Sequence, residues 1–402
     1  MSAPPATGEV HGDPAPDSPS WWQWNAGLGR RFTVGAEEEV MLLDPADHSL
    51  AERSDAVLAR LTDRLGTHLS PETHASVVEL SSGVHLSALG VGLELAALRR
   101  RLAAELAAMG MVAAGAAMHP FSPQTGATVS AAPRYRRLAS SMRWLMQRAP
   151  TMALHVHVGV PDPEDAVRGL NRLREHIPVL LALSANSPFS DGRDTGFSST
   201  RTLTFDAFPR TGPPRAYPSY AAYVEAVDPL IALGAIPDTS FLWWDVRLQP
   251  RLGTVEVRAM DAQTTPRDSA ALTALVQSLV RLELEGSALG SPTAPEVLEE
   301  NRFLAARYGT EARLLDPRQS RRVPVRRLVQ ELLEACRPHA TALGCAAELE
   351  HVSLLAARNG AARQRAWMSR PGRAAILPTL ANRFTGLDKV AGGPTSPAER
   401  SI

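Results

Sequence analysis

The stretch FTVGAEEEVMLL, residues 32–43, decides the fold, because it sets three consecutive carboxylates inside a run that otherwise reads as a buried β-strand. Side chains alternate between the two faces of a strand. Glu37 and Glu39 therefore point to one face, and Glu38 points to the opposite, apolar face, where we expect it to need an arginine partner. The other residues of the apolar face are Val34, Ala36, Val40 and Leu42. The stretch predicts a strand whose apolar face packs in the core and whose other face presents Glu37 and Glu39 as candidate functional residues.

Three more segments repeat this design. VVELSSG carries Glu79, ALHVHVGV carries His155 and His157 on one face, and GTVEVRAMD carries Glu256 and Arg258 on one face. We expect strands at 32–43, 75–83, 111–117, 152–160, 242–249 and 253–261, and helices at 92–110, 134–148, 164–184, 218–233 and 268–286, followed by an almost wholly helical last hundred residues. The pattern predicts an α+β fold, with helices stacked on one side of a mainly antiparallel sheet.

The polar face of this sheet carries an unusual set of side chains. A solvent-exposed face of a sheet normally carries a mixture of Thr, Lys, Gln and Ser. The alternative to a functional site is therefore that this polar face is simply exposed to water. Gathering carboxylates without cations raises their pKa values and costs stability. Glutamate oxygens with one or two imidazoles suit Mg²⁺ or Mn²⁺ better than zinc. Arg258, two residues from Glu256, suits phosphate oxygens. This combination of Glu, His and Arg side chains favours a site in which metal ions and guanidinium groups bind the phosphates of a nucleotide.

The composition argues against several other classes of function. The formal net charge of the 402 residues is +0, which gives no electrostatic basis for binding nucleic acid or an anionic membrane. No apolar run approaches the roughly 18 residues needed to cross a bilayer, and no signal peptide is evident, so we expect a cytoplasmic protein. The only lysine, Lys389, disfavours sites built on lysine, such as a Walker A loop. Cys336 and Cys345 are expected to be buried small side chains without a disulfide.

The chain divides into three predicted regions. Residues 1–28 are expected to form a disordered tail, 29–370 a single catalytic domain whose last third is mostly helical, and 371–402 a loop-rich tail. Between about 185 and 217 the periodicity is lost. Such a stretch inside a domain is usually an active-site or lid loop, although an ordinary surface loop is the alternative. Arg193 and Arg201 lie in this stretch.

Nine motifs in a fixed order carry a family resemblance. They are VGAEEEVMLLD, VVELSSGVH, RYRRL, LHVHVGV, ALSANSPFSDGRDTGFSSTR, FPRTGPP, LWWDVRLQP, TVEVRAMDAQT and ENRFLAARYG. In this order they resemble the carboxylate-amine ligases of the glutamate-cysteine ligase type 2 (YbdK-like) family. The resemblance covers about residues 31–310, with a looser helical continuation to about residue 370. Met152–Leu154 departs from the Cys-Gly of many relatives, and ENRF lacks a Trp that often follows; both bear on substrate identity more than on catalysis.

The resemblance implies a glutamine synthetase-like fold, a curved and mainly antiparallel sheet with helices on its convex side and the active site on its concave side. It implies that two or three Mg²⁺ ions, or Mn²⁺ in their place, hold ATP. Arg258 and Arg201 would contact the phosphates, and Arg193 or Arg201 would meet a substrate carboxylate. His157 would orient nucleotide or substrate, or donate a hydrogen bond to a metal ligand. The ligands carried over from the family are Glu37, Glu39, Glu79, His155 and Glu256.

The implied activity is an ATP-dependent ligation. A carboxylate, by default the γ-carboxylate of glutamate, would become an acyl phosphate that an amine such as the amino group of cysteine captures. The resemblance also suggests a homodimer acting on small-molecule substrates. Two alternatives stay open at this point: a catalytically silent ATP-binding relative that serves as a partner or regulatory subunit, and a metal-dependent amide hydrolase, since H-x-H is also typical of zinc hydrolases.

Overall fold

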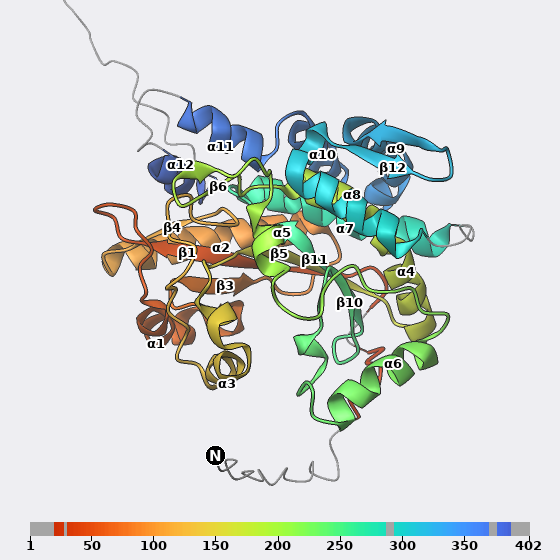
Figure 1. The fold of residues 1–402 in the computed structure, drawn as a ribbon, viewed down its shortest axis with the longest axis horizontal. Coiled ribbons are helices and arrows are strands. Elements are labelled where there is room, and N and C mark those ends of the chain that lie inside the picture. Colours follow the sequence, from red (N-terminus) through yellow and green to blue (C-terminus); the bar gives the residue numbers. More distant parts are fainter. Residues whose placement is uncertain (1–19, 28–29, 287–292, 370–375, 387–402) are drawn as a thin grey trace, which may run out of the picture.

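A seven-stranded antiparallel sheet forms the centre of the structure (Figure 1). The structure is a computed structural model, which describes residues 20–27, 30–286, 293–369 and 376–386. The sheet runs in the order β10-β11-β5-β1-β3-β2, and β4 pairs with the far end of β1. The bounds are β1 (Val34–Leu43), β2 (Leu69–Pro71), β3 (Val77–Ser81), β4 (Val112–Ala114), β5 (Ala153–Gly159), β10 (Val246–Gln249) and β11 (Thr254–Asp261). The prediction of a mainly antiparallel sheet is confirmed.

The pairing of β1 fixes which side chains share a face. Glu37 lies opposite His155 of β5, and Glu39 lies opposite Glu79 of β3. On β1, every second residue from Val34 to Glu38 is buried, whereas the residues between them are only partly buried. This alternation is the one expected from the sequence, because the pleat of a strand sends neighbouring side chains to opposite faces.

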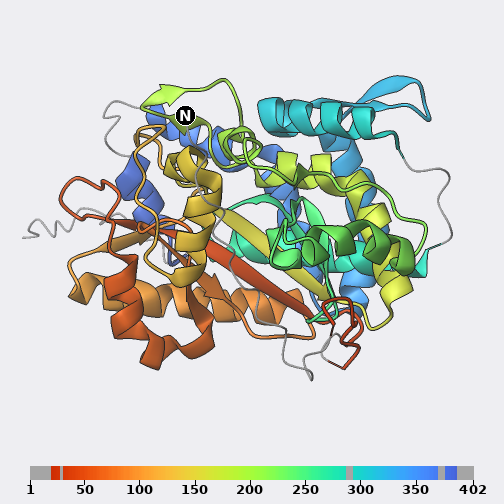
Figure 2. The same cartoon turned by 60° about the horizontal axis from the view of Figure 1, so that its bottom comes forward.

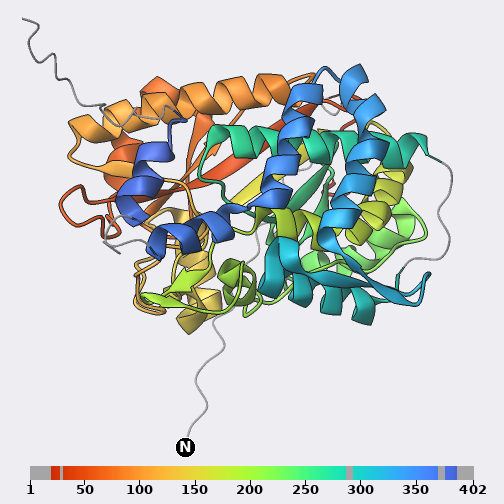
Figure 3. The ribbon, with the colours of Figure 1, turned by 90° about the horizontal axis from the view of Figure 1, so that it is seen from above.

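Helices cover the apolar face of the sheet, as predicted. These are α2 (Ala88–Ala108), α4 (Pro163–Ser184) and α7 (Pro266–Glu285), seen from above in Figure 3. Each begins at a residue whose side chain accepts a hydrogen bond from a backbone N–H of the first turn: Ser87, Asp162 and Thr265. Such caps satisfy donors that the helix itself leaves unpaired. Val34 of β1 and the valines of β5 and β11 pack in one core with these helices.

The expected partner of Glu38 is Arg99 of α2. Both side chains are 1% exposed, and the guanidinium donates from Nε to Oε2 (2.7 Å) and from Nη2 to Oε1 (2.6 Å) of the carboxylate. Arg99 also donates to the backbone oxygens of Gln263, Thr264 and Phe384. One ion pair therefore ties β1 to the helical layer and to the C-terminal part of the described chain.

The polar face of the sheet is covered by a different set of elements. They include α3 (Pro133–Met142) with the 3-10 turn η2 (Arg143–Gln147), α5 (Thr200–Phe205) and the 3-10 turn η3 (Thr239–Phe241). Figure 2 shows α2 and α3 on opposite sides of the sheet. The remaining elements between the sheet strands are α1 (Ser54–Leu65), η1 (Gly66–His68), β6 (Phe189–Ser190), β7 (Arg193–Asp194), β8 (Thr211–Gly212), α6 (Tyr220–Ala232) and β9 (Trp243–Trp244).

The C-terminal region is less uniform than its sequence suggested. Its helices are α8 (Pro295–Tyr308), α9 (Val325–Ala342), α10 (Ala346–Ala357), α11 (Gly360–Met368) and α12 (Ile376–Arg383), with the 3-10 turn η4 (Gly309–Glu311). The expectation of an almost wholly helical region is wrong for residues 313–324, where β12 (Arg313–Asp316) and β13 (Arg321–Pro324) form a hairpin.

The two predicted tails include ordered segments. In α12, which falls in the predicted loop-rich tail, Ile376 and Leu380 are buried. At the other end, Trp21 donates to Asp228 and Trp24 donates to the backbone oxygen of Val160. The rest of both predicted tails lies outside the described residues. Among the described helices, none has the length and hydropathy of a membrane span. Cys336 and Cys345 are buried and unpaired, as expected.

Candidate active site

A cavity of about 310 Å³ lies between the polar face of the sheet and the elements that cover it. Six of the predicted site residues line it: Glu37, Glu39, Glu79, His155, Arg201 and Arg258. A larger hollow of about 660 Å³ opens elsewhere on the molecule, beside residues 47–52, but none of the predicted site residues lines it. The predicted polar face of the sheet therefore borders a cavity. The predicted site residues line this cavity of about 310 Å³ and not the larger hollow.

Carboxylates gather at one end of this cavity. Ligand atoms of Glu39, Glu72 and Glu79 lie within 4.8 Å of one another, and the same holds for Glu37, Glu79 and His155. Burial and the neighbouring charges of Glu37, Glu72 and Glu39 raise the pKa of Glu79 well above its ordinary value. Burial and the charge of Glu72 raise the pKa of Glu39 to about 8. The arrangement costs energy unless a cation offsets the repulsion.

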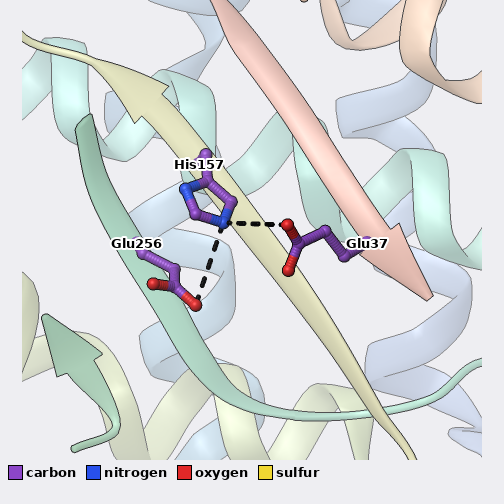
Figure 4. A group of neighbouring side chains, drawn as sticks. All are labelled: Glu37, His157 and Glu256. Atoms are coloured by element: carbon purple, nitrogen blue, oxygen red, sulfur yellow. Dashed lines mark ion pairs between the residues drawn. The ribbon is translucent and has the colours of Figure 1, made fainter. Parts of the chain in front are cut away.

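The two histidines of β5 differ in their surroundings. Burial and the adjacent guanidinium of Arg258 lower the pKa of His155 to about 4, so that its imidazole is neutral. His157 lies between Glu37 and Glu256, with Nε2 at 3.6 and 3.8 Å from their carboxylates (Figure 4). Its Nδ1 is 3.1 Å from the hydroxyl of Thr254, whereas the buried Nε2 has no hydrogen-bond partner among the described residues. That unpaired nitrogen faces the two carboxylates.

Glu256 is bound differently from the other carboxylates. It is fully buried, and both of its oxygens already accept hydrogen bonds from guanidinium groups, from Arg247 Nε at 2.5 Å and from Arg258 Nη1 at 2.6 Å. Gln249 donates a further hydrogen bond at 2.8 Å. Burial would raise the pKa of Glu256, but these two guanidinium groups hold it well below its ordinary value. Glu256 therefore fixes two arginines in addition to facing His157.

Arg201 is positioned by the segment for which the sequence predicted a loop. Ser199 caps α5, and the buried carboxylate of Asp261 accepts hydrogen bonds from the hydroxyls of Ser187 and Ser199. The Nε atoms of Arg201 and Arg258 are buried without a hydrogen-bond partner among the described residues. Both arginines nevertheless line the cavity, where guanidinium groups suit the oxygens of an anionic ligand.

The long segment from 185 to 217 is not a structureless lid. Residues 185–190 and 198–202 are buried, because side-chain hydrogen bonds to Asp261 hold them against the end of β11. Arg193 is exposed in β7 and is absent from the cavity lining. Of the two arginines predicted to meet a substrate carboxylate, only Arg201 reaches the cavity.

Sequence reasoning missed Glu72. This residue follows β2, a strand of only three residues, so alternation gave no signal for it. Its Oε2 accepts a hydrogen bond from the hydroxyl of Tyr135 on α3 at 3.1 Å. An aromatic wall of the same cavity was also missed; it comprises Phe205, Phe208, Phe241 and Trp243, whose rings contact one another.

The donor set fits hard divalent cations. Oxygens of Glu39, Glu72 and Glu79 make a carboxylate site, and Glu37, Glu79 and His155 make a second site with one neutral imidazole. The third group, Glu37, His157 and Glu256, fits less well, because two guanidinium groups already neutralise Glu256. Nε2 of His157 lies at ion-pair distance from Glu37 and Glu256, and the charges of Glu256 and Glu37 outweigh burial and raise the pKa of this imidazole, which favours its protonated form.

We expect Glu72→Gln to weaken divalent-cation binding by about 10- to 100-fold, since one of three carboxylates in its group loses its charge. Calorimetric titration with Mn²⁺ and the Mg²⁺ dependence of activity both measure this. Glu334→Gln, at an exposed position of α9, is the matched control. Unchanged affinity in Glu72→Gln would contradict the assignment of Glu72 to the site.

Comparisons with known proteins place this chain in a family. The model of glutamate-cysteine ligase family 2 matches residues 33–383. Two proteins of Rubrobacter xylanophilus with the provisional name glutamate–cysteine ligase 2 are 40% identical over 336 residues and 42% identical over 351 residues. These matches cover 83% and 86% of this chain and 89% and 95% of the relatives.

Solved structures share the fold at low sequence identity. A glutamate–cysteine ligase of Francisella tularensis in complex with AMP has a TM-score of 0.62 at 13% identity, over 88% of both chains. A bifunctional glutathione synthetase of Pasteurella multocida has a TM-score of 0.57 at 12% identity, over 88% of this chain and 52% of its own. With a family match over most of its length and relatives above 30% identity, the chain belongs to glutamate-cysteine ligase family 2.

Proposed function

We propose that this protein is an ATP-dependent carboxylate-amine ligase that passes through an acyl phosphate. A carboxylate oxygen of the first substrate attacks the γ-phosphorus of ATP, and ADP leaves. The nitrogen of the amine then attacks the acyl carbon, phosphate leaves, and the nitrogen gives up a proton. The observation that carries the proposal is the convergence of five carboxylates, two imidazoles and two arginines with unpaired donors on one face of the sheet.

The cations would be held by two overlapping groups. Glu39, Glu72 and Glu79 form one, and Glu37, Glu79 and His155 form the other, while Glu256 with His157 would hold a third ion only in competition with its arginines. Bound divalent ions would neutralise phosphate oxygens. We propose that two or three Mg²⁺ ions bind, and that Mn²⁺ can take their place.

The arginines supply fixed positive charge. Phosphoryl transfer needs positioning and charge stabilisation more than covalent help from the protein. The Nε atoms of Arg201 and Arg258 lie buried beside the cavity, and Glu256 keeps Arg258 in place through a 2.6 Å hydrogen bond. Both arginines line the cavity, and because their guanidinium charge is already held in place, it can stabilise phosphate oxygens with little reorganisation.

Glutamate and cysteine are the substrates we propose first. They appear in the provisional names of the relatives, and the related fold of the Francisella ligase was solved with AMP, an adenine nucleotide. We also propose the cytoplasm as the compartment, since two buried cysteines stay unpaired.

A phosphate-release screen tests the proposal. Purified full-length protein with Mg·ATP is offered a matrix of amino acids and amines, and products are read by mass spectrometry. We expect ADP, phosphate and one amide in equal amounts, dependent on both substrates. Turnover without nucleotide would instead indicate an amide hydrolase, and ATP binding without any product across the matrix would indicate a silent relative.

A further inference from the structure

Each carboxylate of the first cation group, Glu39, Glu72 and Glu79, accepts a hydrogen bond from a donor of the protein. A backbone N–H holds Glu39, because Ala153 donates to its Oε2 at 2.9 Å. A serine holds Glu79, because Ser70 donates from its hydroxyl to Oε1 at 2.9 Å. Both donors belong to strands of the sheet, β5 and β2. The sheet itself therefore fixes two of the three carboxylates.

Glu72 receives its support from elsewhere. It follows β2, the edge strand, and the pairing of this strand ends at Pro71. Its Oε1 accepts a hydrogen bond from the hydroxyl of Thr73 at 2.6 Å, and its Oε2 accepts one from the hydroxyl of Tyr135 at 3.1 Å. A donor on the adjacent residue fixes the carboxylate only relative to its own segment. Tyr135, in contrast, joins the carboxylate to α3, a helix that covers the polar face.

The ring of Tyr135 is itself held in place. It is partly buried and packs against the apolar cluster that includes Leu138 of α3 and Trp243 of β9. Its hydroxyl lies 3.0 Å from the backbone oxygen of Pro71 as well as 3.1 Å from Oε2 of Glu72. A tyrosine hydroxyl has one proton to donate, and a charged carboxylate is the stronger acceptor of the two. The packed ring thus directs one donor at Glu72.

We propose that Tyr135 is a positioning residue, whose hydroxyl holds Glu72 in the orientation in which it binds a divalent cation together with Glu39 and Glu79. The inference rests on the proposed function, which requires that cation. A free carboxylate loses rotational freedom when it binds an ion, and a hydrogen bond that already orients it lowers this cost. Groups that orient a metal ligand in this way typically change metal affinity by about 10- to 100-fold.

A purely structural role is the alternative for Tyr135. Its hydroxyl would then serve only to attach α3 to the sheet through the backbone oxygen of Pro71. Loss of the hydroxyl would in that case change the stability of the protein and leave its affinity for cations unchanged. The two roles are distinguished by measuring cation binding directly, apart from catalysis.

The test is a calorimetric titration of full-length protein with Mn²⁺ for wild type and Tyr135→Phe. We expect binding to weaken by about tenfold in Tyr135→Phe, and the Mg²⁺ concentration for half-maximal phosphate release to rise by a similar factor. Tyr220→Phe is the matched control. The hydroxyl of Tyr220 also donates to a backbone oxygen, that of Trp22 at 2.6 Å, but Tyr220 is absent from the cavity lining. This control should bind Mn²⁺ as wild type does.

A double variant tests whether Tyr135 acts through Glu72. Once Glu72→Gln has removed the charged ligand, adding Tyr135→Phe should weaken Mn²⁺ binding by less than about twofold. Equal Mn²⁺ affinity in wild type and Tyr135→Phe would overturn the inference, and so would a loss in the double variant equal to the product of the two single losses. A wild-type protein that neither binds Mn²⁺ nor releases phosphate would overturn the proposed function together with this inference.

Discussion

Glu79→Gln is expected to abolish Mg·ATP-dependent phosphate release, by at least about a thousandfold, while it stabilises the metal-free protein. The loss of activity follows because Glu79 belongs to both carboxylate groups that fit a cation. The gain in stability follows because the charges of Glu37, Glu72 and Glu39 lie around Glu79, whereas no arginine among the described residues forms an ion pair with it.

The stability gain of Glu79→Gln should depend on pH. The pKa of Glu79 is raised in the folded state above its ordinary value of 4.5. Such a group destabilises the folded state above its unfolded pKa, so the advantage of Gln should be absent near pH 4 and should grow as the pH rises. Because solvent reaches this partly buried side chain, we expect on the order of 1 kcal/mol at pH 7.5 in EDTA.

Glu256→Gln supplies the contrast for this experiment. It should also lose activity, but it should destabilise the protein, because two buried guanidinium groups lose their shared carboxylate. Urea unfolding of both variants in EDTA, beside the phosphate-release assay, distinguishes the two cases. A Glu79→Gln protein that is less stable than wild type, or that keeps its activity, would refute the assignment of Glu79 to a cation site.

Arg99→Leu is expected to lower the free energy of unfolding by about 3–5 kcal/mol, the usual cost of breaking a buried ion pair on one side. The variant would leave Glu38 charged and 1% exposed, and would remove the donors to Gln263, Thr264 and Phe384. Urea unfolding followed by circular dichroism measures the loss. Arg101→Leu, at an exposed neighbouring position of α2, is the control and should change stability by less than about 0.5 kcal/mol.

A double variant tests the cause of this loss. Glu38→Leu combined with Arg99→Leu removes both charges, and replacing a buried pair by apolar residues is often nearly neutral. We therefore expect the double variant to recover part of the stability lost in Arg99→Leu, which a simple packing defect at Arg99 would not allow.

Much of the sheet was predictable because its strands carry strong alternation. In β5, and in β1 apart from Glu38 and Met41, apolar and polar positions alternate, so the face shared by Glu37 and His155 followed from the sequence. The need of Glu38 for an arginine was also predictable from its place among valines. Which arginine would serve was not, because Arg99 is brought there by packing between distant segments.

The misses have identifiable physical causes. Glu72 follows a strand too short to show a period, and the hairpin at 313–324 is rich in charged residues and resembles the helices around it in composition. The segment from 185 to 217 has the composition of a loop, but its serines bond to the buried carboxylate of Asp261 and become part of the interior. Side-chain hydrogen bonds between distant segments leave no periodic trace in a sequence.

The register of β1 limits how this protein can change over evolutionary time. Loss or gain of one residue between 33 and 36 would shift the strand by one place against β3 and β5, and such a shift sends every side chain to the other face. Glu37 and Glu39 would then face the apolar core, and Val34 and Val40 would face the cavity. Insertions and deletions should accordingly be purged here, and new specificities should arise by substitution or by length changes outside these strands.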